Sequence, residues 1–153
     1  MIETPRIVQT EPLHYAALRQ MIPSQEIGEI MGKGIAEVLG VLKAQGRKPN
    51  GPWFTHHFQR PVDTFDMEIC FPVDEPIEPQ GRIAPAIWPA MKVARTVYHG
   101  HYAGLPHAWP ELDQWMKTEG HTGGSQFWER YLISPNDNPD PKEWRTELNW
   151  PLA

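Results

Sequence analysis

The sequence has 153 residues, enough for one domain that buries a sizeable core. Apolar residues make up 40% of the chain and charged residues 22%, which is typical of a folded soluble protein. The formal net charge of −5 argues against a nucleic-acid-binding protein, since such proteins normally carry a basic stripe.

The first half of the chain is predicted to contain two strands, a helix and two further strands. Apolar residues recur with helical spacing from Ile27 to Leu42, and the helix is expected to continue through Ala44. Ser24 is a suitable N-cap for this helix, and Gly46 is a suitable residue to end it. The strands are expected at residues 6–10, 13–21, 51–58 and 64–73.

The second half repeats this order after the connector DEPIEPQG (74–81), whose charge and prolines predict a solvated segment. A helix is expected over about 105–119, with Trp115 on its apolar stripe and Gly120 ending it. Pro110 fits only near the first turn, which predicts an irregular helix start. The strands are expected at residues 82–88, 91–99, 126–134 and 145–152.

The two halves also match in sequence pattern. MEICFPV (67–73) aligns with TELNWPL (146–152), and WFTHHF (53–58) aligns with FWERYL (127–132). The α+β chain is therefore predicted to be one domain, residues 1–153, built from two ββαββ repeats at about 1–75 and 80–153. The alternative is that two amphipathic halves share some pattern by chance.

The alignment pairs Thr55 with Glu129 and His57 with Tyr131. Because one repeat has a neutral threonine at this position, the fold itself does not require a carboxylate there. We therefore interpret Glu129 as a residue that serves something asymmetric, such as a ligand.

Three segments of the second half carry a resemblance to a known family: TVYHGHYAGLPHAW (96–109), FWERYL (127–132) and NPDPKEWRTELNWPL (138–152). Their order resembles the GyrI-like small-molecule-binding domain, which also serves as the effector-binding domain of AraC-type and MerR-type multidrug regulators. The first half fits more loosely, through its ββαββ order and MEICFPV. The sequence departs from the common pattern at Pro110, and at His101, where many relatives have proline.

The resemblance implies two pseudo-symmetric ββαββ modules of the SHS2-like type, with an antiparallel sheet and a ligand cleft between the modules. It also implies that Glu129 lies at the base of the pocket. An apolar environment disfavours a charged carboxylate, so this group could accept a proton or attract a cation among aromatic rings. The alternative is a structural ion pair with Arg95, Arg130 or Arg145.

Tyr131 is expected on the same strand face as Glu129, because strand side chains alternate. Its hydroxyl could assist Glu129 or contact a ligand; the alternative is a core tyrosine bonded to the backbone. Flat aromatic walls suit flat ligands, although these rings could also simply fill the core. The predicted ligand-binding residues are Phe54, His57, Trp88, Tyr98, Tyr102, Trp109, Phe127, Glu129 and Tyr131.

Two functions follow from these observations and the resemblance. The first is a stand-alone protein that binds a hydrophobic or cationic aromatic small molecule, for detoxification or sensing. The second, implied by some stand-alone relatives, is a hydrolase that opens the cyclopropane of cyclopropanoid DNA-alkylating compounds, with Glu129 activating water and Tyr131 assisting. A third hypothesis is an inhibitor of a protein such as gyrase, which predicts no small-molecule pocket.

The remaining expectations concern cofactors and location. The seven histidines show no convergent ligand set, so neither a metal nor another cofactor is expected. The single Cys70 excludes an internal disulfide and fits a reducing cytosol, and its spacing from histidines does not suggest a nucleophile. No signal peptide or membrane-spanning run is visible, so we expect a cytoplasmic protein without membrane or nucleic-acid partners.

Overall fold

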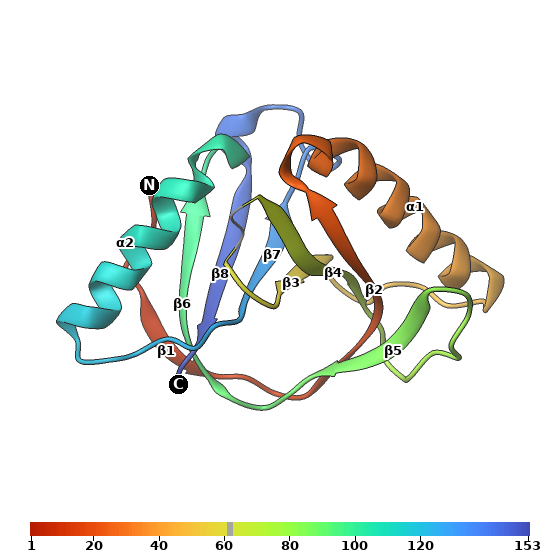
Figure 1. Ribbon diagram of the computed structural model, residues 1–153, viewed down its shortest axis with the longest axis horizontal. Helices are drawn as coiled ribbons and strands as arrows, with labels where there is room; N and C mark the ends of the chain where they lie inside the picture. The colour runs from red at the N-terminus through yellow and green to blue at the C-terminus, as the bar shows by residue number, and fades with distance from the viewer. Residues whose placement is uncertain (61–62) are drawn as a thin grey trace. The chain divides into compact units, whose positions relative to one another are not determined.

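The computed structural model describes residues 1–60 and 63–153 and divides the chain into two compact units (Figure 1). The terminal unit comprises residues 1–10 and 91–153, and the central unit comprises residues 11–90. Each unit joins antiparallel strands to one α-helix, which confirms the predicted α+β class.

The central unit contains α1 (Ile27–Ala44) and the strands β2 (Leu13–Pro23), β3 (Phe54–His57), β4 (Thr64–Pro72) and β5 (Ile83–Trp88). The strands pair in the order β3-β4-β2-β5, and α1 packs on β2 and β4. Leu18, Ile69 and Leu42 belong to the buried cluster between helix and sheet. Gly34 allows this close packing, since a Cβ there would overlap the Ile69 side chain.

The terminal unit contains α2 (Leu105–Thr118) and the strands β1 (Arg6–Gln9), β6 (Lys92–His99), β7 (Phe127–Ile133) and β8 (Arg145–Pro151). The strands pair in the order β1-β6-β8-β7. Helix α2 lies along this sheet (Figure 1) and buries Leu112 and Met116 against Ala94 and Leu148. Burial of this apolar stripe, more than helix propensity, holds α2 on the sheet.

The helix ends agree with the sequence better than the helix starts do. Gly46 and Gly120 follow the helices with φ values of 68° and 79°, as predicted for glycine stops. The predicted N-cap role of Ser24 is wrong, because Ser24 begins a short 3-10 turn (Ser24–Glu26) and its hydroxyl donates to the Asp63 carbonyl.

Pro110 lies inside α2 and not in the first turn, so that prediction is also wrong. The predicted irregular start is present, as the 3-10 turn Tyr102–Gly104. Proline removes one main-chain donor from a helix, but the residues on both sides of Pro110 remain anchored by their apolar stripe. Packing of the stripe therefore carries the helix through the proline.

Strand register agrees with the internal repeat. Thr55 on β3 lies opposite Ile69 on β4, and Glu129 on β7 lies opposite Leu148 on β8. The sequence match pairs Ile69 with Leu148 and Thr55 with Glu129, so the two hairpins have the same register.

The compact units and the sequence repeats divide the chain at different places. Strand β1 belongs to the first repeat but pairs with β6 in the terminal unit. Strand β5 belongs to the second repeat but pairs with β2 in the central unit. The single-domain assignment and the cleft between the modules stay predictions.

Candidate functional site

Glu129 faces helix α2 and is only 9% exposed. It lies opposite Leu148, a member of the core beneath that helix, and paired residues of adjacent strands share a face. The Trp109 Nε1 group donates to Oε2 of Glu129 at 2.8 Å. The Tyr131 hydroxyl donates to Oε1 at 2.9 Å. Two uncharged donors from two different elements therefore hold this carboxylate.

The arginines considered as ion-pair partners of Glu129 have partners elsewhere. Arg130 and Arg95 lie 2.8 and 3.4 Å from Oε1 of Glu147. Glu147 precedes Leu148 on β8, so its side chain is on the sheet face away from Glu129. Arg145 donates to the main-chain carbonyl groups of residues 142 and 144.

Aromatic rings surround the two donors of Glu129. The Trp109 ring centre is 4.6 Å from that of Phe127 and 5.7 Å from that of Trp150. The Tyr131 ring meets Tyr102 edge to face, with ring centres 5.8 Å apart. The structure thus brings together four predicted aromatic residues around Glu129: Tyr102, Trp109, Phe127 and Tyr131.

Trp144 and Trp150 also belong to the aromatic group around Glu129, although the sequence analysis did not predict them as site residues. Trp144 stacks on Tyr102 with ring centres 5.0 Å apart, and its Nε1 group donates to the Asn138 carbonyl at 2.7 Å. The Trp150 Nε1 group donates to the Gly124 carbonyl at 2.8 Å. Both tryptophans lie in NPDPKEWRTELNWPL (138–152), one of the three segments that carry the family resemblance, so the resemblance could have identified them as site residues.

The turn before α2 positions Tyr102. Gly100 adopts a φ of 127°, which other residues rarely adopt, and the His101 Nδ1 atom accepts from the main chain of residue 103. The Tyr98 hydroxyl donates to the His101 carbonyl at 2.8 Å. A Cβ on Gly104 would overlap that hydroxyl. The structure therefore places Tyr98, one of the predicted ligand-binding residues, in the core as a support of the turn.

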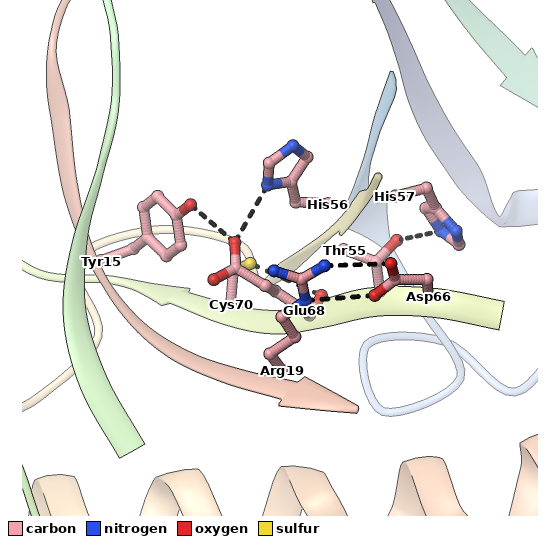
Figure 2. A network of polar contacts seen from close by, with 8 residues as sticks. All are labelled: Tyr15, Arg19, Thr55, His56, His57, Asp66, Glu68 and Cys70. Carbon is pink, nitrogen blue, oxygen red and sulfur yellow. Dashed lines mark hydrogen bonds and ion pairs between the residues drawn. The ribbon is translucent and has the colours of Figure 1, made fainter. Parts of the chain in front are cut away.

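The other predicted residues, Phe54, His57 and Trp88, belong to the central unit. Phe54 and His57 are three residues apart on β3, so they point to opposite faces. Phe54 packs against Trp88, with ring centres 5.2 Å apart. On the other face, His57 Nε2 lies 3.0 Å from the Thr55 hydroxyl (Figure 2). Thr55 and His57 thus repeat the contact between Glu129 and Tyr131 without a carboxylate.

A partly buried carboxylate, Glu68, lies on the face of the central sheet that carries Phe54. The Tyr15 hydroxyl donates to Oε1 of Glu68 at 2.9 Å, and His56 Nδ1 lies 2.9 Å from the same oxygen (Figure 2). His56 and Glu68 match Arg130 and Glu147 in the repeat, and both are cross-strand pairs. This carboxylate position is therefore common to both repeats, unlike the position of Glu129.

Two further groups have altered acidity. Burial raises the pKa of the Cys70 thiol well above its ordinary value, so this residue is a poor nucleophile at neutral pH. Burial and the charges of Glu129 and Asp137 raise the pKa of Tyr102 to about 12. The Tyr102 hydroxyl therefore keeps its proton at neutral pH.

Within residues 1–60 and 63–153, no three His, Cys, Asp or Glu side chains are grouped so that they could hold a metal ion. None of the helices in this described part is long and apolar enough to cross a membrane.

The GyrI-like small molecule binding domain is the family whose model matches this chain, over residues 3–153. This match confirms the resemblance seen in the sequence. No curated protein matches the sequence.

Solved structures share the fold. The C-terminal domain of EcmrR has a TM-score of 0.83 and 22% identity, over 98% of this chain and 97% of that domain. The EcmrR chain in a complex with DNA matches this chain with a TM-score of 0.86 and 21% identity, over 97% of this chain. The match covers 57% of that longer EcmrR chain, so the present chain spans little more than half of it.

Two other structures are also similar. A hydrolase from Listeria innocua has a TM-score of 0.72 and 13% identity, over 97% of this chain and 91% of the hydrolase. SAV2435, in a structure bound to tetraphenylphosphonium, has a TM-score of 0.70 and 12% identity, over 99% of this chain and 94% of that one.

Proposed function

Because the chain belongs to the GyrI-like small molecule binding domain family, we propose that Glu129 and its aromatic neighbours bind a hydrophobic aromatic cation. The observation that carries this proposal is the contrast between Glu129 and Thr55. Both residues occupy the same register position of their repeat, and both contact the side chain two residues later. A neutral residue therefore suffices for the fold at this position.

The chemistry around Glu129 suits a cation with aromatic surface. The carboxylate supplies a negative charge in a place of low solvent exposure, where charge pairs interact more strongly than in water. The rings of Trp109, Phe127 and Tyr131 offer π faces and apolar area. A cation over such a ring gains about 0.5–2 kcal/mol.

Sequestration is the biological role that we propose first, and sensing is the second. A protein that sequesters a toxic cation needs only the binding site. The EcmrR–DNA complex shows a domain of this fold within a DNA-bound regulator, which is the observation that favours sensing. The SAV2435 structure bound to tetraphenylphosphonium supports the choice of a lipophilic cation as ligand class.

Hydrolysis is a further candidate, favoured by the contact between Glu129 and Tyr131. A carboxylate hydrogen-bonded to a phenol could take a proton from water while the phenol orients the attacking or leaving oxygen. The similar fold of the Listeria innocua hydrolase agrees with this candidate. Substoichiometric protein incubated with a cyclopropanoid alkylating agent distinguishes the two functions, because an enzyme consumes many equivalents and a binder protects at most one per site.

The binding proposal is tested with tetraphenylphosphonium and calorimetry. Glu129→Gln should weaken binding by about 2–4 kcal/mol, or roughly 30- to 1000-fold, because a nearly isosteric amide carries no charge. Glu111→Gln, on the exposed side of α2, makes the same change in net charge and should have no effect. Unchanged affinity in folded Glu129→Gln protein would reject the proposal.

A further inference from the structure

Two buried hydroxyl groups next to Tyr131 have no hydrogen-bond partner among the described residues: those of Tyr102 and Thr146. Thr146 is fully buried and lies opposite Tyr131 on the neighbouring strand, so the two side chains share the face of Glu129. Buried polar groups nearly always have a partner, because an unpaired one is destabilising. Two unpaired hydroxyls beside one functional residue therefore call for an explanation.

The Tyr102 hydroxyl is well placed to serve as a hydrogen-bond donor. Its ring is held between Tyr131, at 5.8 Å, and Trp144, at 5.0 Å. Trp144 is itself anchored by its hydrogen bond to the Asn138 carbonyl. A tyrosine hydroxyl is protonated at neutral pH, and the raised pKa of Tyr102 extends this state to more alkaline solution. The group is thus both positioned and in the protonation state needed to donate.

We propose that the ligand of this site carries a hydrogen-bonding group in addition to its positive charge, and that the Tyr102 and Thr146 hydroxyls bind this group. An aromatic cation with an amide, carbonyl or hydroxyl substituent has the required chemistry. The inference rests on the proposed cation-binding function of Glu129. Tyr102 and Thr146 are then specificity-determining residues, because a site with unpaired polar groups discriminates against ligands that cannot pair them.

The first test needs no ligand. Tyr102→Phe and Thr146→Val each remove one hydroxyl and nearly preserve side-chain size. If the hydroxyls are unpaired in the free protein, both variants should melt at the same temperature as the wild type or higher. Tyr131→Phe is the matched control and should melt lower, because it loses the hydrogen bond to Glu129. Melting temperatures of Tyr102→Phe and Thr146→Val as low as that of Tyr131→Phe would overturn the inference.

The second test compares tetraphenylphosphonium with its ortho-, meta- and para-carbamoyl derivatives. At least one derivative should bind the wild type about tenfold more tightly than it binds Tyr102→Phe or Thr146→Val. The unsubstituted cation cannot pair the hydroxyls, so it should bind Tyr102→Phe and Thr146→Val at least as tightly as it binds the wild type. If no derivative distinguishes the wild type from the two variants, the inference is overturned.

The same experiment separates this inference from the proposal on which it rests. Glu129→Gln should weaken binding of all four cations. If Glu129→Gln leaves tetraphenylphosphonium binding intact, cation binding by Glu129 is refuted, and the specificity inference is refuted with it. If Glu129→Gln weakens binding but the carbamoyl group brings no discrimination, only the role of Tyr102 and Thr146 is refuted.

Discussion

The hydrogen bond from Trp109 to Glu129 can be tested by its effect on stability. Trp109→Phe removes the donor 2.8 Å from a carboxylate that is 9% exposed, and it keeps an aromatic ring beside Phe127. A hydrogen bond to a charged group contributes about 1.5–3 kcal/mol. The smaller ring buries less apolar area, which costs roughly 1 kcal/mol. We therefore expect the free energy of unfolding to fall by about 2.5–4 kcal/mol.

Trp115→Phe is the matched control, because Trp115 lies on the same helix and packs partly buried against the same core. Urea unfolding followed by circular dichroism measures both variants. Trp109→Phe should lose about 1.5–3 kcal/mol more than Trp115→Phe, and the excess should fall by roughly half in a Glu129→Gln background. Equal losses would refute the conclusion that this bond holds Glu129 in place.

Three other predictions concern the supporting structure. Gly104→Ala should lower the free energy of unfolding by about 1–3 kcal/mol in thermal unfolding, because the added Cβ would overlap the Tyr98 hydroxyl. Gly40→Ala, in open space on α1, is the control and should raise the free energy of unfolding by about 0.5–1 kcal/mol. Cys70 should resist alkylation in the native protein, and rapid alkylation would contradict this prediction. The free energy of unfolding should fall as pH rises above about 9, because the thiol of the unfolded chain then loses its proton while the buried thiol keeps it. Glu147→Leu should lower the free energy of unfolding in urea by about 3–5 kcal/mol, because Arg95 and Arg130 lose the carboxylate that they share. A loss below about 1 kcal/mol would show that these ion pairs contribute little to stability.

The sequence by itself determined the features that depend on local spacing. Alternation along a strand placed Glu129 and Tyr131 on one face, and their hydrogen bond confirms that these two side chains meet. Helical periodicity and the glycine stops located both helices. The repeat alignment identified Thr55 as the neutral counterpart of Glu129, and the shared strand register agrees with that alignment.

Only the tertiary structure decided which distant elements meet. No local pattern shows that the indole of Trp109 donates to Glu129, 20 residues later in the sequence, because that contact depends on how α2 packs on its sheet. The stacking of Trp144 on Tyr102 likewise brings a loop onto a turn far from it in the sequence. The pairing of β1 with β6 and of β5 with β2 was also hidden, since strand patterns identify strands but not their partners. Spacing along the chain thus determines the direction of a side chain, and packing between elements determines what that side chain contacts.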